Sequence, residues 1–143
     1  MALNKPAPIP LVKELPMNLV NLKYILGKNS DVVYREVVFA GNKQAVVMYV
    51  DSMTNKDWVS EFIIKPLIQK GEKAAELNPL ELSKQTLYIP DITEHQTCEA
   101  FLERLYSGDC GFLVDGYNTG ITTDLKTFDR RGVSEPQTEV VVR

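Results

Sequence analysis

The sequence is poor in the residues that usually mark a metal site, a disulfide framework or a catalytic centre. It has two cysteines, Cys98 and Cys110, and a single histidine, His95. One pair of cysteines at this spacing fits neither a disulfide framework nor a zinc site, and suggests a reducing compartment. We therefore expect no metal and no cofactor. We expect both thiols to be buried and unreactive, and His95 to be an exposed surface residue.

Long apolar runs and clusters of positive charge are also missing. No apolar run approaches the roughly 18 residues of a membrane helix, and the N-terminus lacks the apolar core of a signal peptide. Sixteen Lys and Arg residues stand against 19 Asp and Glu, a net charge of −3. This balance gives no electrostatic reason to expect nucleic acid or an anionic membrane surface as a partner. Taken alone, the chain is expected to be soluble and cytoplasmic.

The composition that remains is that of an ordinary globular protein, with 44% hydrophobic and 24% charged residues over 143 positions. A chain of this length is by default one domain, and it buries roughly 68% of its unfolded surface. We expect a flexible Pro-rich leader over 1–17, a folded domain over 18–126 and an extended tail over 127–143.

The first half of the domain carries turn and periodicity signals. Asn18 is expected to cap a helix over 19–27. Val-rich runs over 31–40 and 44–50 flank a Gly-Asn loop and predict a β-hairpin. Thr54, three residues before an acidic side chain, resembles a capping box. The helix that follows should kink or end near Lys65, before Pro66; its apolar stripe consists of Val59, Phe62, Ile63 and Leu67.

The second half continues the alternation of helices and strands. Asn78 is expected to cap a short helix, and residues 86–90 to form a short strand or an extended segment. Thr93 is expected to cap a helix over 94–106, which places His95 in its first turn. Its apolar stripe is Cys98, Phe101, Leu102 and Leu105. Strand-like runs over 110–116 and 119–125 predict a second hairpin. The fold class is therefore α/β or α+β, with a single small mixed β-sheet and helices packed on it.

Two similar pieces, "MYVDS" (48–52) and "FLVDG" (112–116), end apolar strands with an aspartate and a small residue. Carboxylates at strand ends can bind ligands in open α/β sheets. This makes Asp51, Asp115 and Gly116 candidate ligand-binding residues. The same residues also occur simply because aspartate accepts local backbone hydrogen bonds in turns, and we favour that interpretation.

The end of the chain, "RRGVSEPQTEVVVR" (130–143), resembles the signature of the GerA-type spore germination proteins, the A subunits of nutrient germinant receptors. Three further pieces resemble the same family in the same order: "SDVVYREVVF" (30–39), "YVDSMTNKDWVSEFIIKPLI" (49–68) and "LYSGDCGFLVDG" (105–116). One departure is Ser52, where the family pattern has glycine.

The resemblance implies a role that the chain would fill as part of a larger protein. Family A subunits have a cytoplasmic N-terminal region of two related α/β halves, followed by a membrane-spanning part. This chain resembles the first half, so we expect a fragment of a longer subunit at the spore inner membrane. The implied partners are the second half of the region and the receptor B and C subunits.

Three functions remain open. The first is receptor assembly or signal relay without catalysis, so that the chain is not an enzyme. The second is binding of a small nutrient germinant by this domain, with Asp51 and Asp115 in one polar cleft. The third and least favoured is a small hydrolase or transferase with His95 as its base; no nucleophile–base arrangement supports it.

The tail itself offers candidate interface residues. A proline after Glu135 holds the chain extended, and the valine run has high strand propensity. The charged side chains could pair with a partner surface, although a solvated linker would have the same composition. The candidates are Arg130, Arg131, Glu135, Pro136, Gln137, Thr138, Glu139 and Arg143.

Overall fold

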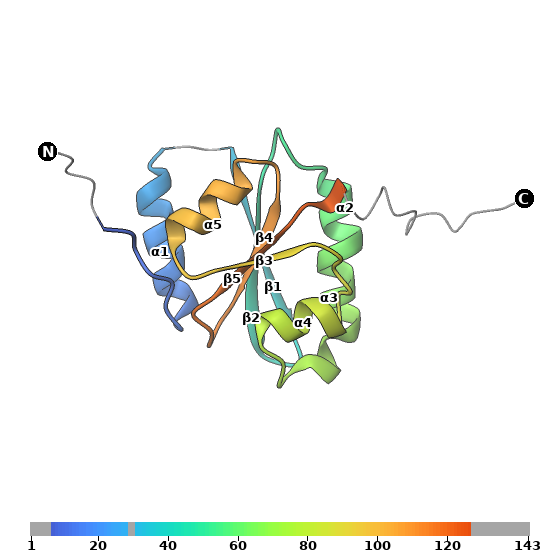
Figure 1. The fold of residues 1–143 in the computed structure, drawn as a ribbon. Coiled ribbons are helices and arrows are strands. Elements are labelled where there is room, and N and C mark those ends of the chain that lie inside the picture. The colour runs from blue at the N-terminus through green and yellow to red at the C-terminus, as the bar shows by residue number, and fades with distance from the viewer. Residues whose placement is uncertain (1–6, 29–30, 127–143) are drawn as a thin grey trace, which may run out of the picture.

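The computed structural model describes residues 7–28 and 31–126. One sheet lies between two layers of helices (Figure 1). In chain order the elements are α1 Leu15–Leu26, β1 Val32–Phe39, β2 Lys43–Val50, α2 Lys56–Val59, α3 Lys65–Lys70, α4 Pro79–Gln85, β3 Ile92–His95, α5 Cys98–Leu105, β4 Cys110–Val114 and β5 Gly120–Thr123. A π-helical turn, Ser60–Ile64, joins α2 to α3, and a 3₁₀ turn, Gly71–Ala74, follows α3.

The five strands lie in the order β1-β2-β4-β5-β3, and every neighbouring pair is antiparallel. Helices α1 and α5 cover one face, and α2, α3 and α4 cover the other (Figure 1). The fold is therefore α+β, one of the two expected classes. The mixed sheet that we expected is wrong, because both hairpins and the pairing between them are antiparallel.

Strand β2 lies inside the sheet and is buried on both faces, which explains its nearly unbroken apolar sequence. Val46, Met48 and Val50 pack in the cluster under α1 and α5. The alternate residues of β2 pack in the cluster under α2, α3 and α4. Each large apolar side chain buried in this way contributes about 1.5–3 kcal/mol. The two cores therefore share the central strands.

Two glycines allow helix α5 to lie close to the sheet. A Cβ atom at Gly111 would lie 2.6 Å from the ring of Phe101, and one at Gly120 would lie 2.7 Å from it. The ring thus occupies the space that side chains on β4 and β5 would fill. All four residues of the expected α5 stripe are buried, which confirms that part of the sequence interpretation.

The expected leader is partly built into the fold. Leu11 and Leu15 are buried in the core under α1. The N–H of Leu11 donates to the Gln96 carbonyl, and the N–H of Cys98 donates to the Ile9 carbonyl. Flexibility over the whole of 1–17 is therefore wrong for residues 9–17, because these backbone bonds and apolar contacts fasten them beside α5.

Three of the expected helix caps lie at the wrong residue. Helix α1 begins at Leu15, with Pro16 in its first turn, so Asn18 lies inside it. Asn55 caps α2 by accepting from two backbone N–H groups, whereas the Thr54 hydroxyl donates to the Gly108 carbonyl. Thr97 caps α5, four residues after the expected Thr93. For α2 and α5 a second residue with capping ability stands close by, and local sequence cannot choose between them; helix α1 has no side-chain cap at its N-cap position, Glu14.

The start of α4 and the break before Pro66 lie where the sequence predicts them. Asn78 and Glu81 form the capping box of α4. The π-helical turn lies directly before Lys65, where Pro66 cannot donate to the preceding turn, and the helix then continues to Lys70. Of the two alternatives for residues 86–90, the short strand is wrong; strand β3 begins two residues further on, at Ile92.

Candidate functional site

The structure places the two candidate aspartates at opposite ends of the sheet. Asp51 follows β2, and Asp115 follows β4, which runs antiparallel to β2. The Asp115 N–H donates to the carbonyl of Gln44, at the start of β2. The seven residue-to-residue steps from Gln44 to Asp51 span about 23 Å of extended chain. A single polar cleft containing both carboxylates is therefore excluded by the strand directions.

Asp115 and Gly116 hold the N-terminal segment. The Asp115 carboxylate accepts from the N–H of Leu15 at 2.9 Å, and the Gly116 N–H donates to the Lys13 carbonyl at 2.7 Å. Gly116 has φ 100°, a conformation that glycine adopts without strain. The partner of the Asp115 carboxylate is therefore not a local turn amide but the first residue of helix α1, 100 positions away in the sequence.

Asn18 also holds the N-terminal segment in place. It is fully buried, and its side chain accepts from the Val12 N–H at 2.8 Å and donates to the Val12 carbonyl at 2.7 Å. The amide therefore pairs with an extended backbone as a neighbouring strand residue would. This explains why a polar side chain is retained on the inner side of α1.

His95 is buried and not exposed as expected, because it ends strand β3 instead of starting a helix. Its Nε2 shares a 2.8 Å hydrogen bond with the Thr122 hydroxyl, and its ring packs edge-on to Phe101. Burial, aided by the positive charge of Arg104, holds the pKa of His95 below 6.5. The imidazole thus contacts a hydroxyl and an aromatic ring, as a histidine with a structural role does.

Beside His95, the buried Asp109 pairs with Arg104, whose side chain is 44% exposed. Asp109 accepts from Nε of Arg104 at 3.0 Å and from its second guanidinium nitrogen at 3.3 Å. Burial raises the pKa of Asp109, and the bonds to Arg104 only partly offset this effect. The pair closes the loop between α5 and β4.

The two cysteines are buried and unpaired, as expected. Burial raises the pKa of Cys98 to about 11 and raises that of Cys110 further. Thiols that stay protonated in an apolar core are poor nucleophiles. Across residues 7–28 and 31–126, no three His, Cys, Asp or Glu side chains gather as metal ligands would. None of the helices in that part of the chain combines the length and apolarity needed to cross a membrane.

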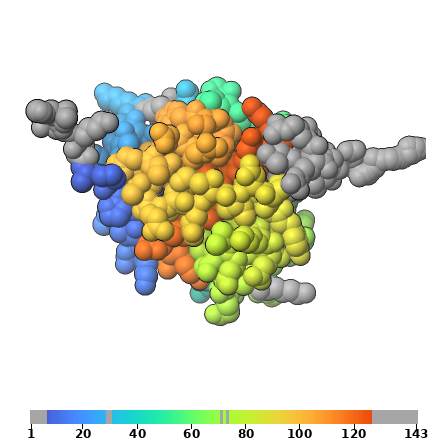
Figure 2. All heavy atoms as spheres, viewed as in Figure 1, coloured from blue at the N-terminus to red at the C-terminus, as the bar shows by residue number. Residues whose placement is uncertain are grey.

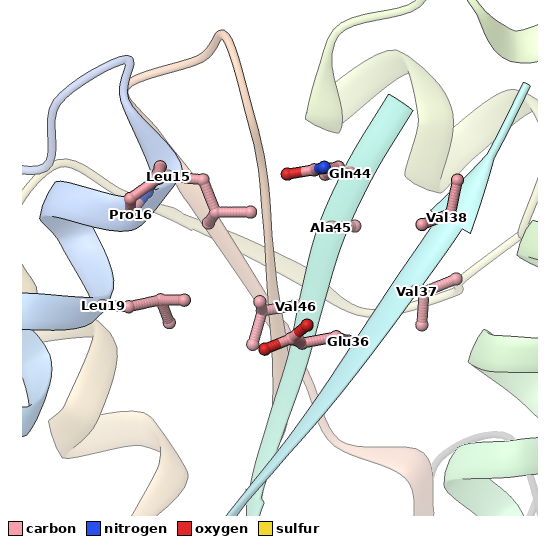
Figure 3. A pocket seen from close by; sticks show the side chains of 9 residues that line it. All are labelled: Leu15, Pro16, Leu19, Glu36, Val37, Val38, Gln44, Ala45 and Val46. Carbon is pink, nitrogen blue, oxygen red and sulfur yellow. The ribbon is translucent and has the colours of Figure 1, made fainter. Parts of the chain in front are cut away.

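A groove of about 280 Å³ lies between α1 and the β1–β2 hairpin. Leu15 and Leu19 extend from α1 toward Val46, and the Glu36 carboxylate lies on the same side of the hairpin (Figure 3). The other lining residues are Pro16, Val37, Val38, Gln44 and Ala45. We call this feature the α1–β1 groove.

The outer side of α1 adds an exposed apolar row to the groove. Met17 is 50% exposed, Val20 61% and Tyr24 80%. Their spacing of three and four residues places them on one side of the helix. Figure 2 shows α1, in blue, at the margin of the molecule, beside α5. A helix that is apolar on both its inner and outer sides is typical of an element covered by a partner. The sequence did not reveal this row, because exposure depends on what packs around the helix.

The candidate interface residues Arg130, Arg131, Glu135, Pro136, Gln137, Thr138, Glu139 and Arg143 lie outside the described residues. Comparison with known proteins nevertheless includes them. Residues 20–143 match the model of a family described as "Bacillus/Clostridium GerA spore germination protein". The chain belongs to this family.

Curated members of the GerA family align with most of the chain. Spore germination protein B1 of Bacillus subtilis (strain 168) is 30% identical over 131 residues, which cover 91% of this chain and 27% of that protein. Spore germination protein A1 of the same organism is 29% identical over 126 residues, covering 86% and 25%. The chain thus spans about a quarter of the length of these relatives.

A solved structure shows the same fold. The crystal structure of the N-terminal domain of the A subunit of the Bacillus megaterium spore germinant receptor GerK3 superposes with a TM-score of 0.69 at 23% identity. The match covers 83% of this chain and 49% of that chain. The recognition of a GerA-type N-terminal region from its sequence motifs is confirmed.

Proposed function

We propose that this chain is the first half of the cytoplasmic N-terminal region of a spore germinant receptor A subunit, and that it acts through receptor assembly or signal relay. GerA family membership and the fold shared with a receptor A subunit support the receptor assignment. The proposed partners are the second half of that region and the receptor B and C subunits, at the spore inner membrane.

The single observation that carries this mode of action is the exposed row Met17, Val20 and Tyr24. Covering apolar surface of this kind with a partner stabilises the complex by about 25 cal/mol for each Å² that is removed from water. The buried titratable groups, by contrast, have structural partners or raised thiol pKa values. The domain therefore carries features of a binding module, and we infer that it works without catalysis of its own.

The test replaces the row by Met17→Gln, Val20→Gln and Tyr24→Gln in the full-length subunit of an endospore-forming host. Glutamine keeps helix propensity while it removes the apolar surface. We expect spores to lose most of their response to nutrients, and co-purification of the other receptor subunits to fall. The same triple variant of residues 1–143 should keep its fold, measured by circular dichroism, since the three side chains are exposed.

Ile68→Gln is the matched control, because Ile68 is 55% exposed on α3, in the other helix layer. It should leave the nutrient response and the subunit association unchanged. A normal response of the triple variant, at normal subunit levels, would show that the row is not an assembly surface.

A second candidate function, binding of a small molecule by this domain, is favoured by the α1–β1 groove. The groove combines an apolar floor with one carboxylate and one amide, from Glu36 and Gln44. Calorimetric titration of residues 1–143 with amino acids, sugars and nucleosides tests it. Binding should be lost in Leu19→Trp, which fills the groove, and the absence of heat across the panel would exclude this function for the isolated chain.

A further inference from the structure

Strand β1 is an edge strand whose outer backbone groups can be assigned from the register. The Asp51 N–H donates to the Asp31 carbonyl at 2.8 Å, so this pair is a hydrogen-bonded one. Bonded and non-bonded pairs alternate along an antiparallel ladder. Every second residue from Val33 therefore bonds to β2. The N–H and C=O groups that point to the outer side of the sheet belong to Val32, Tyr34, Glu36 and Val38.

The open part of this edge adjoins the α1–β1 groove. Glu36 and Val38 are exposed, and both line the groove. An extended segment beside β1 could thus bond through its backbone and place alternate side chains in the groove. This is how sheets recognise added strands: the backbone gives affinity and the pockets give selectivity. The adjacent charges of Arg35 and Glu36 disfavour the pairing of this edge with strands that do not carry complementary charges.

We propose that residues 138–143 of this same chain, "TEVVVR", add as a sixth strand to the outer edge of β1. This segment lies outside the described residues, and the described chain ends at Lys126. A parallel register that sets Glu139 beside Arg35 places Val140 beside Glu36 and Val142 beside Val38. One register thus pairs the opposite charges of Glu139 and Arg35 and also places the two valines beside the residues that line the groove. The antiparallel register with the same valine positions would set Arg143 beside Arg35, an unfavourable pair.

The chain between Lys126 and this segment is long enough. A strand outside β1 lies four strand spacings from β5, about 19 Å, and β1 is about 26 Å long. The diagonal of that rectangle is about 32 Å. The eleven residues 127–137 span up to about 36 Å when extended. The connection is therefore long enough to reach the outer edge of β1.

A second copy is a poorer occupant of this edge. Two β1 strands related by a two-fold axis at the middle of the strand would set Arg35 against Arg35, or Glu36 against Glu36. Like charges directly opposite each other destabilise a strand pair. The tail of the same chain avoids this repulsion.

The test is amide hydrogen exchange of residues 1–143, followed by NMR. The amides of Glu36 and Val38 do not bond to β2, so their protection reports an added strand. We expect each to exchange at least about tenfold more slowly than in a chain truncated after Lys126. The β2-bonded amides of Arg35 and Val37 are internal controls and should change much less. Equal exchange of the outward amides in both chains would overturn the proposal.

Point variants test the register. Val141→Pro removes the N–H that would donate to the Glu36 carbonyl, and should abolish the protection. Thr138→Pro is the control, because in this register its N–H points away from β1 and protection should remain. Arg35→Glu should reduce the protection, and adding Glu139→Arg should restore it. Protection that rises with protein concentration would assign the strand to a second copy and contradict the proposal.

Discussion

At the scale of single residues, His95 gives the domain a pH-dependent stability. Its pKa is held below 6.5 by burial and by Arg104, so in the folded state it stays neutral where the unfolded chain takes up a proton. The unfolded state therefore binds more protons below about pH 6.5, and stability falls as the pH drops through that value. His95→Gln should flatten this part of the profile, measured as the free energy of unfolding in urea between about pH 7.5 and 5.

The control for this experiment is the difference between wild type and variant at each pH. Asp109 has a raised pKa, so its effect has the opposite sign: ionisation of this buried carboxyl destabilises the fold as the pH rises. Both proteins contain Asp109, and the subtraction removes its contribution. A difference that is constant from pH 7.5 to 5 would contradict the assigned environment of His95.

At the scale of elements, the start of α1 depends on a carboxylate that is distant in sequence. Asp115 accepts from the Leu15 N–H, one of the N-terminal donors that a helix cannot satisfy itself. Asp115→Ala should therefore cost about 1 kcal/mol, the usual value for loss of a helix N-cap. Asp115→Asn should cost less, because an amide oxygen can still accept. Urea unfolding at pH 7 measures both.

Asp51 provides the matched control, since it follows β2 in a piece of sequence that resembles the one around Asp115. Its side chain is exposed, so Asp51→Ala should change the stability by at most about 0.5 kcal/mol. Equal losses for the two alanine variants would show that Asp115 acts as an ordinary turn residue and not as the anchor of α1.

The elements also show which structural features the sequence could reveal. Both hairpins and the stripes of α5 and of the helix through Leu67 follow from side-chain periodicity, which burial on one side imposes. The cap of α4 was found because Asn78, Pro79 and Glu81 leave no competing start. The caps of α1 and α5 were missed because Asn18 and Thr93 are good local candidates, and tertiary contacts decided against them.

Of the candidate site, the sequence indicated the family, but neither the distant partner of Asp115 nor the exposed surface of α1. The carboxylates at 51 and 115 look equivalent in sequence, and only the antiparallel strand order separates them. The outer row of α1 escaped notice because exposure depends on what packs nearby. His95 was misplaced because a shift of the helix start by four residues moves it from a helix into a strand.

At the scale of the whole molecule, two helix layers share one set of strands. β4 is buried along its whole length and β2 from Ala45 to Val50, so neither core can lose its packing without exposing the strands of the other. This arrangement predicts a single cooperative unfolding transition. The sole tryptophan, Trp58, packs against the core of the α2–α4 layer and reports on that side.

Leu22→Ala and Leu67→Ala test this coupling, because each removes a fully buried leucine from a different core. Each should cost about 2–5 kcal/mol. In both variants the Trp58 fluorescence and the far-ultraviolet circular dichroism should give the same midpoint in urea, shifted together from wild type. If the layers unfolded independently, Leu22→Ala would leave the Trp58 transition in place. Coincident shifts would instead show that the surface of α1 is stabilised by the entire sheet, as a rigid docking surface requires.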